Sequence, residues 1–259
     1  MQTPMQNHFA VFNTYFDKIY VLSVAAAAQR REKFKQQFHG LDYEFFYGAD
    51  KAALSLEALI DKGVYSDELT RKNHRYNKTM LPGEVACAWS HKMIYEELIA
   101  KKYNRVLIFE DDATVNAGNL NKAQSVLNEL PQTWEMLMWG WGENEEQTLM
   151  GRLKQSVYHI QHTVGLLKWE HRMIANLFPR RFSKHLKHAG FHDFTYSYAI
   201  TRSAAEKLIA MQSPIQYTAD NLLAHACTKK VVNGFIAWPR VFEHDVPGPQ
   251  TEVASYIRS

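Results

Sequence analysis

Cysteine is scarce in this 259-residue sequence, which contains only Cys87 and Cys227. Two thiols do not make a disulfide scaffold in a chain of this length, and they are typical of a protein in a reducing compartment. The sequence also lacks an apolar run of about eighteen residues, which a membrane-spanning helix requires. Residues 1–16 lack the basic start and the apolar stretch of a signal peptide. We therefore expect a cytoplasmic protein without a transmembrane helix.

Internal repeats, low-complexity runs and linker-like stretches are absent as well. With 22% charged residues, 46% hydrophobic residues and a formal net charge of +3, the composition is ordinary for a soluble protein. The sequence has no zinc-binding spacing and no nucleic-acid-binding signature, so we do not expect nucleic acid as a partner. These absences predict a single domain over residues 1–259.

What the sequence does contain is an alternation of strand and helix patterns. Apolar runs bounded by turn residues predict strands over residues 18–24, 43–47, 106–109, 134–139, 191–201 and 231–238. Helical spacing and capping residues predict helices over residues 25–38, 54–61, 82–99, 119–130 and 203–211, the last capped by Ser203, and a further helix that opens at Asp220. Residues 1–16 and 67–79 are polar and predict a leader and a surface loop. The alternation predicts an α/β fold whose mixed, mostly parallel sheet is covered by helices on both faces.

The most informative stretch is the apolar run over residues 106–109, which ends in three adjacent carboxylates, Glu110, Asp111 and Asp112. Such a run suits a strand covered on both faces, and ligands of open α/β sheets bind beyond the carboxyl ends of these strands. Three adjacent like charges repel each other unless a cation lies between them, and Mg²⁺ and Mn²⁺ prefer such oxygen ligands. The pattern predicts a divalent-cation site. An acidic loop that caps the next helix is the alternative.

Polar side chains near the end of the first strand form a second candidate site. Ser23 ends that strand, and Arg30 and Arg31 lie in the helix that follows. Hydroxyl and guanidinium groups bind phosphates, so these residues predict contacts with a phosphorylated ligand, and a solvated helix surface is the alternative. Ser90 and His91 interrupt the apolar pattern of a later helix, where a buried core histidine is the more common structural role.

Two further stretches predict other contacts, one with a sugar and one with an anionic partner. Trp141 stands between Gly140 and Gly142 at the end of a strand, where an indole ring is a usual stacking surface for a sugar and glycine allows close approach. Residues 168–188 form a basic segment in which only Glu170 is acidic. This basic segment predicts an anionic partner, either a phosphorylated saccharide or acidic lipid head groups, and a solvated charged face is the alternative.

Several of these motifs resemble glycosyltransferase family 25, the lipopolysaccharide galactosyl- and glucosyltransferases that are related to collagen glycosyltransferases. The matching stretches follow the family order and cover about three quarters of the chain. They are Lys18-Ile-Tyr-Val-Leu-Ser with Arg30-Arg31-Glu32, Phe45-Phe46-Tyr-Gly-Ala-Asp50, Leu81-Pro-Gly-Glu-Val-Ala-Cys-Ala-Trp-Ser-His91, Leu107-Ile-Phe-Glu-Asp-Asp112, Thr195-Tyr-Ser-Tyr-Ala-Ile-Thr-Arg with Ala204-Ala-Glu-Lys-Leu208, and Asp220 with Leu223. The resemblance implies a GT-A fold, a nucleotide-sugar donor and inversion at the anomeric carbon.

The chain departs from the family after the first strand, where residues 25–28 are all alanine. The family usually carries a polar, charged turn at this point, so a donor contact from the turn is not expected here. The loop over residues 140–146 is locally similar to the Trp-Gly-Trp-Gly acceptor loop of β-1,4-galactosyltransferases, although its place in the chain differs.

The resemblance also implies roles for the acidic residues. Asp112 is the expected principal ligand of Mn²⁺ or Mg²⁺, Glu110 or Asp111 holds the ribose or a metal-bound water, and His244 is the expected third ligand. Asp220 is the expected general base, with Glu143 and Asp193 as reserves. The expected donor-binding residues are Ser23, Arg30, Arg31, Asp50, Gly83, Glu84, Ser90, His91, Glu110 and Asp111, and the expected acceptor-binding residues are Trp141, Tyr196 and Tyr198.

The implied activity is transfer of a hexose, galactose before glucose, from a UDP-sugar to a saccharide of the lipopolysaccharide or lipooligosaccharide core. The basic segment would then face the acceptor or the inner membrane surface. Two alternatives share the fold. One is a GT-A-like protein that binds a nucleotide sugar without transferring it, which retention of the acidic residues disfavours. The other is a sugar nucleotidyltransferase, which should carry a glycine-rich phosphate loop, whereas residues 23–29 contain no glycine.

Overall fold

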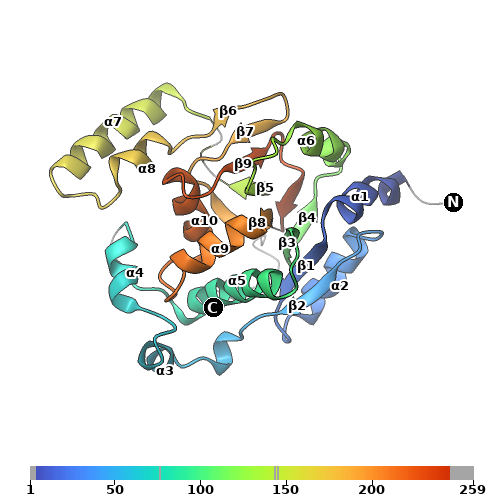
Figure 1. The fold of residues 1–259 in the computed structure, drawn as a ribbon, viewed down its shortest axis with the longest axis horizontal. Coiled ribbons are helices and arrows are strands. Elements are labelled where there is room, and N and C mark those ends of the chain that lie inside the picture. The colour runs from blue at the N-terminus through green and yellow to red at the C-terminus, as the bar shows by residue number, and fades with distance from the viewer. Residues whose placement is uncertain (1–3, 76, 143, 145, 246–259) are drawn as a thin grey trace.

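A mixed sheet of eight strands forms the centre of the protein (Figure 1). The computed structural model describes residues 4–75, 77–142, 144 and 146–245. In the order of the sheet, the strands are β2 (Glu44–Tyr47), β1 (Lys18–Ser23), β3 (Arg105–Glu110), β8 (Asp193–Thr201), β5 (Met136–Gly142), β9 (Gly234–Ala237), β7 (Leu186–His188) and β6 (Arg180–Arg181). Strands β8 and β7 run against the direction of the others. The carboxyl ends of β1, β3, β5 and β9 therefore lie along one edge of the sheet.

Helices cover both faces of this sheet, as the sequence predicts. Helices α1 (Pro4–Tyr15), α2 (Ala28–Gln37) and α6 (Ala123–Glu129) share one apolar core with the first face. Helices α5 (Pro82–Ala100), α9 (Arg202–Met211) and α10 (Ala219–Thr228) share a second core with the other face. The central strands are buried on both sides, which explains why the run over residues 106–109 is continuously apolar.

Smaller elements complete the fold. Strands β4 (Ala113–Val115) and β10 (Phe242–His244) form a two-stranded antiparallel sheet directly after the acidic residues. Helix α3 (Leu56–Asp61) packs near the start of α5, and helix α4 (Asp67–Asn73) follows it in the chain. Helices α7 (Leu149–Thr163) and α8 (His171–Ala175) pack on a separate apolar cluster. Short 3-10 helices span Lys51–Ala53 and Leu120–Lys122. Among the described helices, none combines the length and the apolar character needed to cross a bilayer.

Two expected irregular segments are helices. The expected polar leader contains α1, in which Phe9 and Phe12 are completely buried against the sheet. Burial of one Phe side chain contributes about 1.5–3 kcal/mol, so this helix is part of the core. The expected surface loop over residues 67–79 begins with α4, whose first turn is capped by the hydroxyl of Ser66 accepting from the amide of Leu69. Both predictions were wrong: in α1 the polar residues obscured the apolar face, and α4, whose buried residue is Thr70, has no apolar face to predict it from.

The cap of α9 also differs from the prediction. The Thr201 hydroxyl, and not that of Ser203, accepts from a first-turn amide, that of Ala204. The Ser203 hydroxyl instead donates to the carboxylate of Glu135 at 2.6 Å. A cap is defined by where the preceding strand ends, and β8 continues to Thr201.

Candidate active site

The carboxyl ends of β1 and β3 bring the two predicted sites together. The strands pair in parallel, with Leu22 opposite Glu110, so Ser23 lies beside Asp111. The Ser23 hydroxyl donates to Oδ2 of Asp111 at 2.6 Å, and the Asp111 amide donates to the Leu22 carbonyl at 3.1 Å. Residues that are 88 positions apart in the chain thus form one cluster at the edge where α/β sheets bind ligands.

Arg30 neutralises part of the acidic cluster. Its Nη2 lies 2.6 Å from Oδ1 of Asp111 and 2.7 Å from Oδ2 of Asp112. The side chain is only 15% exposed, so the solvated alternative for Arg30 does not hold. Arg31 has a different role, because its guanidinium donates to the Ser23 hydroxyl and to the carbonyls of Val24 and Ala25. Arg31 therefore fixes the turn between β1 and α2.

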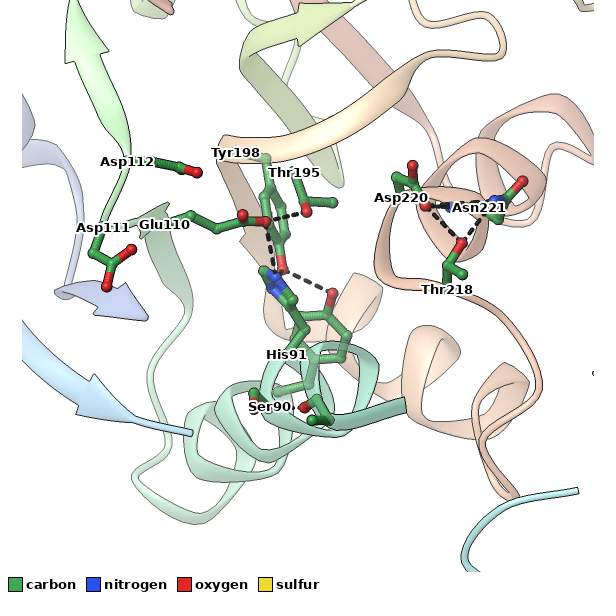
Figure 2. Close-up of polar contacts among 12 residues, drawn as sticks. Ser90, His91, Glu110, Asp111, Asp112, Thr195, Tyr198, Thr218, Asp220 and Asn221 are labelled. Carbon is green, nitrogen blue, oxygen red and sulfur yellow. Dashed lines mark hydrogen bonds and ion pairs between the residues drawn. The ribbon is translucent and has the colours of Figure 1, made fainter. Parts of the chain in front are cut away.

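A chain of hydrogen bonds leads from Glu110 into the core (Figure 2). Oε1 of Glu110 accepts from the Thr195 hydroxyl and lies 3.3 Å from Nε2 of His91. On its other side, Nδ1 of the completely buried His91 lies 2.7 Å from the Tyr198 hydroxyl, which lies 2.8 Å from that of Tyr95. This chain holds Glu110 in one orientation at the strand end.

Burial and mutual repulsion give the three carboxyl groups different pKa values. Burial, with the negative charge of Glu110 as the next cause, raises the pKa of Asp112 to about 7. Burial also raises the pKa of Asp111. For Glu110 burial again raises the pKa, but the contacts with His91 and Thr195 outweigh it and the net pKa lies below its usual value. Near neutral pH, Asp112 is thus the carboxyl group of the cluster that takes up a proton most readily, while Glu110 stays ionised.

Asp112 has an oxygen that could bind a divalent cation. Oδ1 of Asp112 is buried and has no hydrogen-bond partner, which is costly unless another group binds there. Carboxylate oxygens are the ligands that Mg²⁺ and Mn²⁺ prefer. A second arrangement groups ligand atoms of Cys87, His91 and Glu110 within 4.8 Å of one another. Both ring nitrogens of His91 are already in hydrogen bonds, and burial raises the pKa of the Cys87 thiol well above its usual value, so this second group fits a hard cation poorly.

His244 approaches the same region from β10. It pairs with Ala113, the residue after Asp112, and its ring stacks on that of Tyr196 with the centroids 4.9 Å apart. In the part of the chain that the structure describes, the group of possible metal ligands around Glu110 includes neither His244 nor Asp112. Its role as a third metal ligand stays a prediction.

Asp220 stands on the opposite side of Glu110 from Asp111 in the view of Figure 2. It lies in the first turn of α10, and its Oδ1 accepts from the Thr218 hydroxyl at 2.6 Å and from the Asn221 amide at 2.8 Å. Oδ2 has no partner among the described residues. After burial, the charges of Glu110, Asp220 and Asp112 are the next causes that raise the pKa of the Cys87 thiol, so all three acids lie close enough to act on this thiol.

The predicted acceptor-binding aromatic residues are buried. Trp141 is completely buried, its indole nitrogen donates to the Ala237 carbonyl at 3.0 Å, and its ring stacks on that of Trp238. Tyr196 is 2% exposed and donates to the Trp141 carbonyl, and Tyr198 is 0% exposed and contacts His91. All three rings are thus packed in the core of this structure, and their contact with an acceptor stays a prediction.

The glycines beside Trp141 serve packing rather than ligand approach. A Cβ at Gly140 would lie 1.9 Å from the ring of Tyr196, and a Cβ at Gly142 would lie 2.3 Å from the ring of Phe194. Strand β5 is glycine-rich here because aromatic side chains of β8 cross it where the register of the two strands shifts. Packing alone thus accounts for both glycines, and close approach of a ligand to them stays a prediction.

Four predicted donor-binding residues have structural contacts. Asp50 and Glu84 cap helices by accepting from the amides of Ala52 at 2.9 Å and Leu81 at 2.8 Å. The Ser90 hydroxyl accepts from the Ala49 amide at 2.9 Å. The remaining residue, Gly83, is buried in the first turn of α5. Their contacts with a donor stay predictions.

The reserve bases are less informative. Asp193 is half-buried at the start of β8, opposite Gly142, and Glu143 lies outside the described residues.

Sequence reasoning missed two residues of the site, Thr195 and Cys87. A signal existed for both. Thr195 is a polar residue in a strand of buried residues, and Cys87 precedes His91 by one helical turn, which puts both on the same helix face.

The raised pKa of Asp112 predicts a measurable pH dependence of stability. The folded pKa of about 7 exceeds the unfolded value of about 3.9, so the unfolded state binds fewer protons and stability falls as pH rises between these values. The full shift would correspond to about 4 kcal/mol at about 1.4 kcal/mol per pKa unit. Because the side chain is 32% exposed, we expect about 1–2 kcal/mol.

Urea unfolding with a chelator present, at about pH 5 and about pH 8, tests this dependence. We compare the free energy of unfolding of Asp112→Asn with that of the wild type. This difference should shift in favour of the variant by about 1–2 kcal/mol from the lower to the higher pH. Added Mn²⁺ should stabilise the wild type more at the higher pH, because protons then compete less for Asp112. A stability difference that does not change with pH would contradict the assignment.

Comparison with known proteins gives one consistent family. Residues 16–223 match the model described as "Glycosyltransferase family 25 (LPS biosynthesis protein)". A "Glycosyltransferase 25 family member" of Aedes aegypti is 29% identical over 145 residues, which are 51% of this chain and 23% of the relative. The "Lipooligosaccharide biosynthesis protein lic2B" of Haemophilus influenzae is 31% identical over 94 residues, 36% of this chain and 32% of the relative.

The family also contains members that are named as inactive. "Inactive glycosyltransferase 25 family member 3" of Homo sapiens is 26% identical over 200 residues, which are 76% of this chain and 29% of the relative. This chain spans about a quarter of the length of such curated relatives.

Proposed function

Because this chain belongs to glycosyltransferase family 25, we propose that it transfers a hexose from a UDP-sugar to a saccharide acceptor with inversion at the anomeric carbon. The observation that carries the proposal is the acidic cluster at the ends of β1 and β3, where Asp112 has an unpartnered buried oxygen. Galactose is the favoured hexose and glucose the next. The acceptor is a sugar of a lipopolysaccharide or lipooligosaccharide core, as the name of the Haemophilus influenzae relative suggests, and the location is the cytoplasm.

The donor diphosphate is proposed to bind where Ser23 and Arg30 meet Asp111. The hydroxyl and the guanidinium at this strand end are donors for phosphate oxygens. Asp112 and Glu110 hold the cation, Mn²⁺ or Mg²⁺, which when bound stabilises negative charge on the leaving diphosphate as a Lewis acid. The hydrogen-bonded chain from His91 to Tyr95 keeps Glu110 oriented for this role.

Asp220 is proposed to take the proton of the acceptor hydroxyl. In an inverting transfer, the acceptor oxygen forms a bond to the anomeric carbon from the face opposite the bond that breaks to the diphosphate, and a base removes the hydroxyl proton. Asp220 lies across Glu110 from the donor cluster and has Oδ2 free of hydrogen bonds among the described residues. The pair of Thr218 and Asn221 on Oδ1 fixes the carboxylate.

The acceptor is proposed to extend toward a hollow of about 400 Å³ on the basic segment. Arg181, Lys184, Lys187 and Trp238 contribute to its wall. It lies near the ends of β9 and β7, on the sheet edge that carries the acidic cluster, about three to four strands or about 15–19 Å away. This distance suits a short saccharide whose phosphate or carboxylate contacts the hollow while its terminal hydroxyl reaches Asp220.

Reversing two charges of the hollow tests this acceptor contact. Arg181 and Lys184 are exposed, so Arg181→Glu with Lys184→Glu should leave the fold and kcat unchanged. We expect KM for a phosphorylated acceptor to rise about tenfold at low salt and less at high salt, because the contact is electrostatic. Lys62→Glu with Lys72→Glu, also at exposed positions, is the charge-matched control. An equal change of KM in both variants would show that only net charge matters.

A thermal-shift screen of nucleotide sugars with Mn²⁺ tests donor binding. A donor present at about a hundred times its dissociation constant should stabilise the protein by about 2.7 kcal/mol. UDP-galactose is the expected best ligand, and absence of stabilisation by every UDP-sugar would contradict the proposal.

The relatives named as inactive favour one second candidate, a protein that binds a nucleotide sugar without transferring it. This candidate predicts the same thermal shift and no glycosylated product.

A further inference from the structure

Helix α7 is attached to the protein by one narrow face. The buried residues of this face are Gly151, Gln155 and Tyr158. Gln155 donates through Nε2 to the Ile174 carbonyl at 2.7 Å, and the Tyr158 ring packs edge-on against Trp169 with the centroids 5.9 Å apart. These contacts fix both the position of the helix and its rotation about its own axis.

The opposite face of α7 is apolar and exposed. Its large apolar side chains are between 49% and 75% exposed, far more than is usual for such residues. At about 100° per residue they fall within an arc of about 100°, opposite the buried face. The members of this apolar stripe are Leu149, Met150, Leu153, Val157, Ile160 and, just after the helix, Val164. Leu166, 77% exposed, continues the stripe beyond the helix end.

The charges around the apolar stripe have one sign. Residues 147–169 contain no Asp or Glu. By the same helical geometry Arg152 and Lys154 lie on opposite sides of the apolar stripe, and both are exposed. Figure 1 shows α7 at the margin of the molecule, with α8 between it and the body of the protein. The described chain therefore leaves the apolar stripe and its flanking cations uncovered.

We propose that α7 docks the protein on the surface of a membrane that contains anionic lipid. In this arrangement the helix lies parallel to the surface, the apolar stripe enters the boundary between head groups and acyl chains, and Arg152 and Lys154 contact lipid phosphates. The 15-residue helix is about 22 Å long, which gives a continuous contact along its whole length.

The geometry of α7 favours a flat surface over other partners. A protein groove that encloses an amphipathic helix would need more of its circumference, but the face opposite the apolar stripe is fixed to α8 and its neighbours. Pairing of two copies through the apolar stripe would bring Arg152 and Lys154 of each copy together with no acidic residue of α7 to compensate them. Anionic lipid compensates these charges and covers the apolar side chains at once.

Sedimentation with vesicles, without donor or acceptor, tests the proposal independently of the transfer reaction. The wild type should bind vesicles of phosphatidylcholine mixed with phosphatidylglycerol about tenfold more tightly than vesicles of phosphatidylcholine alone. Leu153→Glu with Ile160→Glu should weaken binding to the mixed vesicles about tenfold or more. The matched control is Ile60→Glu with Val231→Glu, which adds the same charge at exposed aliphatic residues elsewhere and should bind as the wild type does.

Two further measurements keep the test decisive. Circular dichroism melting must show that both double variants are folded, and Arg152→Glu with Lys154→Glu should lose the preference for anionic vesicles even if the apolar residues are intact. Unchanged vesicle binding by the variant with charges in the apolar stripe would overturn the proposal. The proposal would also be overturned if the wild type were a dimer that binds no vesicles and if the same variant were a monomer. Loss of vesicle binding with normal transfer to a soluble acceptor would separate this role from catalysis.

Discussion

We expect Asp112→Ala to reduce sugar transfer about a thousandfold or more while the protein stays folded. Asp112 carries the buried oxygen without a partner, and burial together with the charge of Glu110 raises its pKa to about 7. Removal of an electrostatic group that stabilises the leaving charge typically costs about 10²–10³ in rate, and loss of the cation adds to this. The measurement is the rate of product formation with a UDP-hexose over a series of Mn²⁺ concentrations.

The expected loss is not a loss of folding. Asp112→Ala removes a carboxylate that is costly to ionise in the folded state, so above about pH 7 the variant should melt no lower than the metal-free wild type. Asp61→Ala, at an exposed position on α3, is the control and should retain full activity. Activity of Asp112→Ala close to that of the wild type would remove the metal assignment from this residue.

The second large effect is expected at Asp220. Asp220→Asn should lower kcat about 10²–10⁴-fold, the usual contribution of a general base, and leave the dissociation constant of the donor nearly unchanged. The amide oxygen of Asn can still accept from the Thr218 hydroxyl and the Asn221 amide, so the start of α10 should be preserved. Stopped-time transfer assays and calorimetric titration with the donor give the two quantities separately.

Asp193→Asn provides the discriminating comparison for the base. If Asp220 is the base, Asp193→Asn keeps most of the activity, and the acidic limb of the pH–rate profile is lost only in Asp220→Asn. A wild-type rate in Asp220→Asn, together with collapse in Asp193→Asn, would transfer the role to the start of β8.

The sequence was informative where function follows from a local pattern. The run over residues 106–109 had to be a buried strand, and the rule that ligands bind at the carboxyl ends of such strands located the acidic residues correctly. The same rule brought Ser23 and Arg30 to Asp111, because adjacent parallel strands end at one edge. The capping residues of α5 are equally local, and they predicted its start at Pro82.

Side-chain roles that depend on distant packing were not predictable. His91 and Tyr198 are 107 residues apart, and only the folded sheet shows that they form one hydrogen-bonded chain. Trp141 has the local sequence of a ligand-binding loop, but the register shift between β5 and β8 puts its ring in the core. Helix α7 was not predicted either. Its exposed face is apolar and its buried face contains only Gly151, Gln155 and Tyr158, which is the reverse of the usual pattern.

The central claim is that the acidic cluster serves transfer of a sugar and not only binding of a nucleotide sugar. Its most direct test is to incubate the purified protein with UDP-galactose, Mn²⁺ and a lipooligosaccharide core acceptor, and to measure the acceptor by mass spectrometry. We predict a gain of one hexose residue that the wild type produces and that Asp112→Ala and Asp220→Asn do not. Donor binding in the thermal-shift screen without any gain in acceptor mass, for UDP-galactose and UDP-glucose alike, would contradict this claim.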